Sequence, residues 1–301
     1  MRLNKLITTC LSLILLVPSL TQAKEIKLLT SIKPIQLIAA AIQEGISTPE
    51  VLLPVGASAH HYSLRPDDIQ KIQNADLFYW IGPDMEIFLT KTVATRNNNA
   101  TAIQKLPNIK LRRFSENEKD HDEHDHEHQA GQIDPHLWLS PENANIMATR
   151  MAEDLSKLDP ENKEHYQHNL QVFQTELNAT DRAIRGELDK VTLVPFFVSH
   201  ETYDYFEAAY GVKHSGVFSL NSSVQPGVKQ VAEMQERLKS MGNSCIFYEP
   251  PIKPKLIDTL TNNLPVKSYE LDAMGAEVPM TSKGYPALLN ELAKQLLQCK
   301  K

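Results

Sequence analysis

The sequence predicts an α/β protein of two lobes, each built on a parallel four-stranded sheet flanked by helices, with a long rigid interdomain helix joining them. Three observations predict it. Short runs rich in β-branched and aromatic residues alternate with helical patterns in both halves, which favours parallel sheets covered on both faces. An uninterrupted helical pattern lies between the halves. The chain has 301 residues, 42% of them hydrophobic, which is enough for two packed cores.

The first 23 residues differ in character from the rest. Arg2 and Lys5 precede an apolar stretch from Leu11 to Leu20, and small residues follow up to Ala23. This order is typical of a secretory signal peptide, and we expect cleavage after Ala23. The apolar stretch is shorter than the roughly 20 residues that a membrane-spanning helix needs. Cys10 lies inside the signal and is expected to leave with it.

The first lobe is predicted to extend from residue 24 to residue 158. It contains strand patterns at residues 25–31, 50–55, 76–81 and 109–114, and helical patterns at residues 34–43 and 66–73. A further helix begins at Ser140-Pro141, because serine is a good N-cap and proline fits the first helical turn. Asp159-Pro160 ends that helix.

The connection between the lobes is predicted to be a single helix over residues 159–190. From residue 161 onward its apolar positions keep helical spacing, and a helix of that length spans roughly 45 Å, longer than one lobe requires. The second lobe then covers residues 191–301. Its strand patterns lie at residues 193–198, 213–218, 245–248 and 266–271.

An acidic run from Ser115 to Gln132 contains four histidines, His121, His124, His126 and His128. Imidazole and carboxylate side chains both bind divalent cations, so this segment is predicted to capture metal in an auxiliary role. The alternative, an incidental or engineered polyhistidine tract, fits poorly because tags are contiguous and terminal. This run is internal and interleaved with acids.

The charge and the cysteines restrict the possible functions further. Removing two basic residues with the signal changes the formal charge from −6 to −8, and the acidic run alone carries −6. Since no basic stripe remains to neutralise phosphates, we do not expect nucleic acid as a partner. Only Cys245 and Cys299 remain after cleavage. In an oxidising compartment they are expected to form one disulfide, two free buried thiols being the alternative.

Three histidines outside the acidic run share a structural position. His60 and His200 follow predicted strands, one in each lobe, and His136 follows the acidic run. In open α/β sheets ligands bind beyond the carboxyl ends of strands, so these side chains are expected to meet in a cleft between the lobes. Asp272 ends another predicted strand and is a possible fourth ligand. Three imidazoles with an oxygen donor or water form a tetrahedral zinc site, although a lone histidine is more often structural.

These residues belong to motifs that are distributed along the whole mature chain. They are residues 53–62 with Pro66 and Asp68, residues 74–83, residues 134–141, and the pairs Ser199-His200 and Leu271-Asp272. The set resembles the cluster A-I solute-binding proteins, which are metal-binding receptors of bacterial ABC importers, and above all their periplasmic zinc-uptake branch. The resemblance implies that His60, His136 and His200 ligate the metal. The manganese branch has glutamate at the third position, so His200 favours zinc.

One departure from the zinc branch leaves the fourth ligand open. Some members carry glutamate immediately before the first histidine, whereas this chain has Ala59 there and an extra His61 after it. Water, Asp272 or a side chain of the acidic run could complete the site. His61 is the weaker candidate, because adjacent side chains normally point apart.

The resemblance therefore implies a periplasmic receptor that is not an enzyme. It would capture Zn²⁺ as a transported ligand and deliver it to the membrane permease and ATPase subunits of an ABC importer, and we expect it to be a monomer. Alternatives are a manganese or iron receptor of the same family, a metal buffer or adhesin without a transporter, and a secreted zinc hydrolase. The hydrolase has little support, because there is no His-Glu-x-x-His motif. Glu201 could be proposed as a general base, but it directly follows His200 and would tend to face elsewhere.

Overall fold

The structure is a computed structural model that describes residues 26–96, 99–114, 131–218, 226–251 and 253–301. The predicted signal peptide and most of the acidic histidine run, with all four of its histidines, lie outside these ranges. Among the described residues, no helix has both the length and the apolar character needed to cross a membrane.

The first sheet has four parallel strands in the order β2-β1-β3-β4. They are β1 (Leu28–Thr30), β2 (Glu50–Val51), β3 (Leu77–Trp80) and β4 (Asn99–Ala102). Helices α1 (Lys33–Ile42), α2 (Pro66–Asn74) and α3 (Thr90–Ala94) connect them. Every residue of β3 is buried, as expected for a central parallel strand covered on both faces.

One strand assignment from the sequence is wrong. The pattern at residues 109–114 was expected to supply the fourth strand of this sheet, but β5 (Arg112–Arg113) pairs antiparallel with β6 (Ile133–Asp134) in a separate ladder. The fourth strand is instead β4. It escapes a pattern search because an edge strand needs no continuous apolar run, and Asn-Ala-Thr-Ala offers none.

The second sheet repeats this arrangement. Its strands are β7 (Phe196–Val198), β8 (Gly216–Val217), β9 (Ser244–Tyr248) and β10 (Val266–Glu270), in the order β10-β9-β7-β8. All four predicted strands are confirmed. Helices α6 (Asp204–Tyr210), α7 (Val228–Met241) and α8 (Lys255–Thr261) flank the sheet. In both sheets the first strand lies between the second and the third, so the two lobes have the same strand order.

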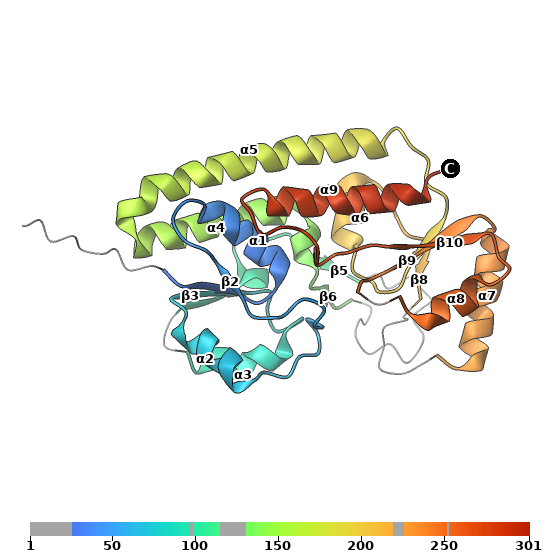
Figure 1. Cartoon of the computed structure of the whole chain (residues 1–301), viewed down its shortest axis with the longest axis horizontal. Coiled ribbons are helices and arrows are strands. Elements are labelled where there is room, and N and C mark those ends of the chain that lie inside the picture. The colour runs from blue at the N-terminus through green and yellow to red at the C-terminus, as the bar shows by residue number, and fades with distance from the viewer. Residues whose placement is uncertain (1–25, 97–98, 115–130, 219–225, 252) are drawn as a thin grey trace, which may run out of the picture.

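Two long helices follow the first sheet, as predicted. Helix α4 (Pro141–Leu158) begins where the side chain of Ser140 accepts a hydrogen bond from the main-chain N–H of Asn143. A short 3-10 turn at Pro160–Asn162 separates it from α5 (Lys163–Leu188), whose 26 residues extend roughly 39 Å. Figure 1 shows α5 running along one side of the molecule, from the first lobe to the second.

The C-terminal helix α9 (Gly284–Leu296) connects the lobes a second time. It packs against both α1 and α5, and Figure 1 shows it alongside α5. The contact with α1 is close: a Cβ atom at Gly284 would lie 2.7 Å from Cδ2 of Leu37 and 2.8 Å from the carbonyl oxygen of Pro279. One continuous set of buried side chains therefore extends from the first sheet through α1, α4, α5 and α9 to the second sheet.

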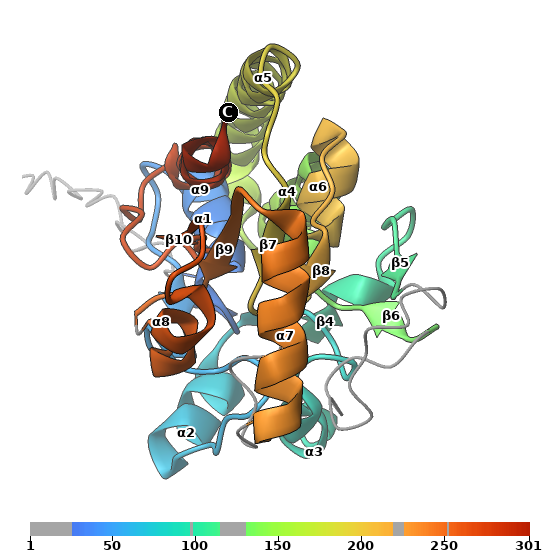
Figure 2. The same cartoon turned by 90° about the vertical axis from the view of Figure 1, so that its right-hand side faces the viewer.

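A smaller core fills the other face of the second sheet. There Phe197 and Ile246 pack against Met234 and Leu238 of α7 and Ile257 of α8. Figure 2 shows α7 and α8 covering this side of the molecule.

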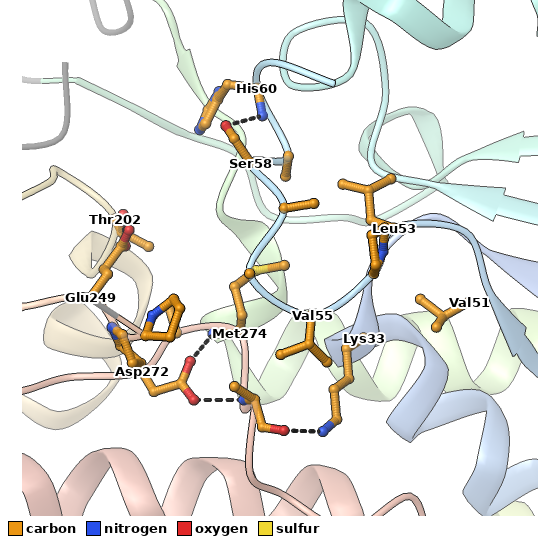
Figure 3. Close-up of a pocket in the computed structure, with 18 of the residues that line it drawn as sticks. Lys33, Val51, Leu53, Val55, Ser58, His60, Thr202, Glu249, Asp272 and Met274 are labelled. Atoms are coloured by element: carbon orange, nitrogen blue, oxygen red, sulfur yellow. Dashed lines mark hydrogen bonds between the residues drawn. The ribbon is translucent and has the colours of Figure 1, made fainter. Parts of the chain in front are cut away.

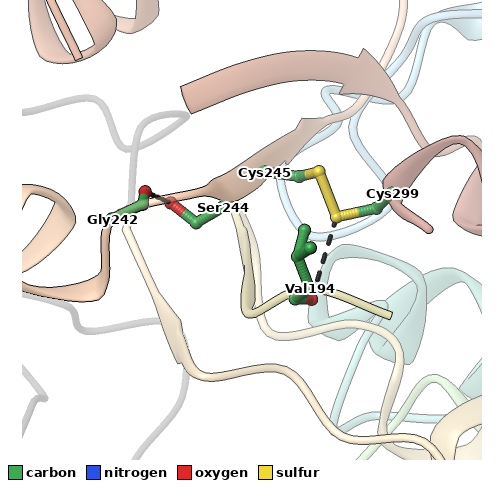
Figure 4. Close-up of a disulfide and its surroundings, with 5 residues drawn as sticks. All are labelled: Val194, Gly242, Ser244, Cys245 and Cys299. Carbon is green, nitrogen blue, oxygen red and sulfur yellow. Dashed lines mark hydrogen bonds between the residues drawn. A yellow bond between two sulfur atoms is a disulfide. The ribbon is translucent and has the colours of Figure 1, made fainter. Parts of the chain in front are cut away.

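The predicted disulfide is present. Cys245 near the start of β9 is bonded to Cys299, which ends the short 3-10 turn after α9, and their Cα atoms are 6.0 Å apart (Figure 4). The bond ties the end of the C-terminal helix to the second sheet.

Candidate metal centre

Three histidines from three separate segments converge. One potential ligand atom from each of His60, His136 and His200 lies within 4.8 Å of the others. The ring centroids are 5.1 to 5.4 Å apart, and the Nε2 atoms of His60 and His136 are separated by 3.3 Å. Three nitrogen atoms at such separations can surround one zinc ion with modest adjustment, since Zn–N bonds are about 2.0 to 2.1 Å long.

His60 lies on the loop that follows β2. The chain turns at Gly56, which has a positive φ of 79°, and Ser58 then accepts hydrogen bonds from the main-chain N–H groups of His60 and His61. Burial, reinforced by the nearby His200, lowers the pKa of His60 to about 3. The imidazole is therefore neutral at physiological pH, which is the form that binds metals.

His136 follows β6 and is almost fully buried, with 1% of its surface exposed. Its Nδ1 lies 2.7 Å from Oδ1 of Asp134, and the same oxygen accepts the main-chain N–H of His136 at 2.9 Å. A carboxylate hydrogen-bonded to Nδ1 directs Nε2 toward a metal. Burial raises the pKa of Asp134 well above its ordinary value.

His200 follows β7. Its Nδ1 lies 2.7 Å from Oγ1 of Thr202 and 3.2 Å from Oε1 of Glu249. Sequence reasoning missed both partners. Glu249 directly follows β9, so the rule that located the histidines, polar residues at the carboxyl ends of strands, could have located it too.

Asp272 lies at the same end of the second sheet, directly after β10 and Leu271. Its Oδ1 accepts the main-chain N–H groups of Met274 and Gly275, both at 2.9 Å, and its Oδ2 accepts that of Ala276 at 2.6 Å. Burial raises the pKa of Asp272, and the three hydrogen bonds oppose that effect. The carboxylate thus closes a turn, and among the described residues it lies outside the three-histidine group.

The histidines line a cavity of about 670 Å³. Residues from both lobes form its walls. In Figure 3, His60 lies at the top of the view, Lys33 at the lower right, and Glu249 and Asp272 at the left. Lys33 donates a hydrogen bond to the carbonyl oxygen of Ala276 at 2.7 Å. The histidine group therefore lies within an interlobe cleft.

A second group of acidic and histidine side chains lies on α6 and the segment after it. Nδ1 of His214 is 2.9 Å from both carboxylate oxygens of Glu207, with Asp204 nearby. Both members of the close pair are buried, and burial raises the pKa of Glu207. The pair joins α6 to the segment leading into β8, which is a structural role.

The comparisons with known proteins agree with this architecture. The family model described as zinc-uptake complex component A, periplasmic, matches residues 28–299. The chain belongs to this family. It is 34% identical over 287 residues to the high-affinity zinc uptake system protein ZnuA of Yersinia pestis, with 90% of each chain covered. It is 35% identical over 285 residues to the ZnuA protein of Haemophilus ducreyi, covering 90% of this chain and 92% of that one.

Solved structures share the fold. A crystal structure of ZnuA has a TM-score of 0.75 at 21% identity, covering 92% of this chain and 99% of that one. Zn(II)-bound AdcA from Streptococcus pneumoniae has a TM-score of 0.72 at 22% identity, with 91% and 57% covered. FpvC from Pseudomonas aeruginosa in complex with Mn²⁺ has a TM-score of 0.74 at 19% identity, with 92% and 98% covered. The fold class predicted from the sequence is thereby confirmed.

Membership of the zinc-uptake family also bears on the class of function. The family is one of substrate-binding receptors, and this favours a receptor over a zinc hydrolase.

Proposed function

We propose that this protein is a periplasmic receptor that binds one Zn²⁺ through His60, His136 and His200. The observation that carries the proposal is the convergence of these three side chains within 4.8 Å in an interlobe cleft. The relatives from Yersinia pestis and Haemophilus ducreyi are named as high-affinity zinc uptake proteins, which supports zinc as the transported ligand.

The ligand chemistry favours zinc over manganese. Imidazole nitrogen suits Zn²⁺, whereas Mn²⁺ is bound better by carboxylate and other oxygen donors. The manganese complex of FpvC shares the fold, but this does not support a manganese receptor. At 19% identity that likeness concerns the fold alone.

For the fourth position on the metal we propose water or a side chain of the acidic run. Asp272 is the less suitable donor, because each of its oxygens already accepts main-chain N–H groups of the turn that follows it. Binding zinc through Asp272 would cost those hydrogen bonds.

The delivery route and the domain division complete the proposal. The signal peptide would place the protein in the periplasm, and the permease and ATPase subunits of an ABC importer would be its partners. The receptor would act as a monomer.

We assign residues 24–158 to the first lobe, 159–190 to the linking helix and 191–301 to the second lobe. The histidines of the acidic run would capture scarce zinc close to the cleft.

A competition titration tests the proposed site. Zinc is titrated into the mature protein against a chromogenic chelator of known affinity, for the wild type and for His60→Ala, His136→Ala and His200→Ala. Each replacement should abolish the tight phase. His61→Ala is the matched control, because this neighbouring histidine is exposed, and the replacement should leave the tight phase intact.

Manganese in place of zinc, at the same concentrations, tests the cargo. Tighter binding of manganese than of zinc by the wild type would contradict the proposal. Retention of the tight zinc phase in the His200→Ala protein would contradict the ligand assignment.

A further inference from the structure

Thr202, Glu249 and His200 form a closed triangle of polar atoms at the cleft. Nδ1 of His200 is 2.7 Å from Oγ1 of Thr202, and that hydroxyl is 3.1 Å from Oε1 of Glu249. The third side, from Nδ1 to Oε1, is 3.2 Å. Thr202 is buried, and the side chain of Glu249 is 25% exposed.

The fold brings these groups together. His200 and Thr202 follow β7, and Glu249 follows β9, the neighbouring strand of the second sheet. The two strands pair in parallel with Val198 opposite Phe247, so their carboxyl ends lie side by side. A carboxylate placed directly after β9 therefore meets a side chain placed directly after β7.

The hydrogens that these three groups carry determine which group donates and which accepts in each hydrogen bond. A threonine hydroxyl carries one hydrogen, and an ionised carboxylate can only accept. At neutral pH a glutamate side chain is ordinarily an ionised carboxylate. With an ionised carboxylate, the hydroxyl of Thr202 donates to Glu249. Its oxygen then accepts from Nδ1, so Nδ1 of His200 carries the ring proton.

We propose that Thr202 and Glu249 are positioning residues that hold His200 in the Nδ1–H form, so that its Nε2 lone pair faces the metal. The inference rests on the proposed function, because it assigns these residues to the same zinc site. The opposite tautomer carries its proton on Nε2 and cannot ligate a metal through that atom. The triangle thus excludes the form of His200 that would not bind.

His136 and His200 differ in the groups that contact Nδ1. Nδ1 of His136 contacts the Asp134 carboxylate at 2.7 Å, whereas Nδ1 of His200 lies 2.7 Å from the hydroxyl of Thr202 and 3.2 Å from the carboxylate of Glu249. An acidic side chain on the Nδ1 side therefore orients the ring of each histidine. Removal of such an outer partner typically lowers metal affinity by about 10- to 100-fold.

Glu249→Gln is the variant that allows donor and acceptor roles in these hydrogen bonds to be exchanged. Its amide keeps the shape of the side chain, but its NH₂ group can donate to Thr202 or His200, which permits the Nε2–H tautomer. We expect zinc affinity to fall by about 10- to 100-fold. Glu277→Gln is the matched control, since it makes the same charge change on an exposed residue of the loop after Asp272, and it should leave the affinity unchanged.

The tautomer itself is measured without zinc. Long-range ¹H–¹⁵N correlation spectra of the zinc-free protein distinguish an Nδ1–H from an Nε2–H imidazole, and the His200 signals are assigned by their loss in His200→Ala. The wild type should show Nδ1–H, and Glu249→Gln should show a substantial Nε2–H fraction. An Nε2–H signal for His200 in the wild type would overturn the inference even if zinc binds tightly.

Two further comparisons separate positioning from general structural support. Thr202→Ser keeps the hydroxyl and should bind zinc like the wild type, whereas Thr202→Val keeps the shape, loses the hydroxyl and should bind more weakly. In a double-mutant cycle, measured on the weaker zinc binding that remains in His200→Ala, Glu249→Gln should have no further effect once His200 is alanine. An equal loss of affinity in both backgrounds would show that Glu249 does not act through His200. Failure of the wild type itself to bind zinc would contradict the proposed function instead.

Discussion

Trp138 donates its indole N–H to the main-chain carbonyl oxygen of Ala273 at 2.9 Å, a hydrogen bond between two buried residues of opposite lobes. The hydroxyl of Tyr285 donates in turn to the carbonyl oxygen of Trp138 at 2.6 Å. Trp138 lies two residues after His136, and Ala273 follows Asp272. The lobes are therefore cross-linked beside the metal centre, in addition to the core that they share through α5 and α9.

Small lobe motion on zinc binding is the first prediction. Opening the cleft by a hinge would break the Trp138 bond and expose part of a continuous core, both of which cost free energy. X-ray scattering of protein lacking residues 116–129 should therefore give nearly the same radius of gyration with and without zinc. A clear decrease in radius on zinc addition would contradict it. Trp138→Phe, which leaves the carbonyl oxygen of Ala273 without this donor, should lower stability by about 1 to 3 kcal/mol.

The disulfide is predicted to support stability and not zinc affinity. It closes a loop with a sequence separation of 54, for which the chain-entropy model gives on the order of 4 kcal/mol. Cys245 lies near the amino end of β9, whereas Glu249 follows its carboxyl end, roughly 13 Å along the strand. Urea unfolding of the Cys245→Ala/Cys299→Ala protein should show the lost stability. A parallel zinc titration should match the wild type, and a large drop in affinity would contradict this separation.

Glu86 gives a prediction for the dependence of stability on pH. It is fully buried and accepts the main-chain N–H groups of Ile81 and Gly82, and burial raises its pKa from 4.5 to about 7. Between those values the folded protein binds more protons than the unfolded chain. The stability from this group is therefore fully present below pH 4.5 and is lost as pH rises through about 7, on the order of 3 kcal/mol.

Glu86→Gln should remove that loss, because its amide does not ionise. The variant should be more stable than the wild type at pH 8 and similar to it at pH 5, as measured by urea unfolding at the two pH values. Glu187→Gln on the exposed face of α5 is the control and should leave the difference between pH 5 and pH 8 unchanged. A wild type whose stability is equal at both pH values, while Glu86→Gln changes nothing, would argue against a raised pKa.

The acidic histidine run is predicted to assist capture and to be dispensable for the tight site. Its net charge of −6 attracts cations over about 10 Å at ordinary ionic strength, and its histidines offer weak sites. Deleting residues 116–129 should remove secondary zinc binding in calorimetric titration and slow growth only in zinc-limited medium. If the deletion also abolishes the tight phase, a side chain of the run is a ligand at the fourth position.

Much of the fold could be predicted from the sequence because the strands of a covered parallel sheet are nearly continuous apolar runs. Leu77–Trp80 and Cys245–Tyr248 are clear examples. The edge strand Asn99–Ala102 could not be found, since its pairing with β3 comes from tertiary structure and not from its own pattern. The antiparallel ladder at Arg112–Arg113 was misassigned for the same reason.

The candidate site, like the fold, could be predicted from the sequence only in part. The positions of His60 and His200 after strands were visible in the sequence, and the structure brings both together with His136. The contacts behind them were not. Glu249 lies 49 residues from His200 along the chain, and only the pairing of β7 with β9 shows that they meet. Likewise, the bonding of Asp272 to its own turn depends on local backbone conformation that residue types do not reveal.

The central claim is that one zinc ion is bound by His60, His136 and His200 in the cleft between the lobes. X-ray diffraction from crystals of the zinc-loaded protein, measured on both sides of the zinc absorption edge, tests it most directly. The account predicts a single strong anomalous peak at about 2.0 to 2.1 Å from one ring nitrogen of each of these three histidines, with Nε2 as the ligand atom of His200. A strong peak elsewhere, or one whose coordination omits His200, would contradict it.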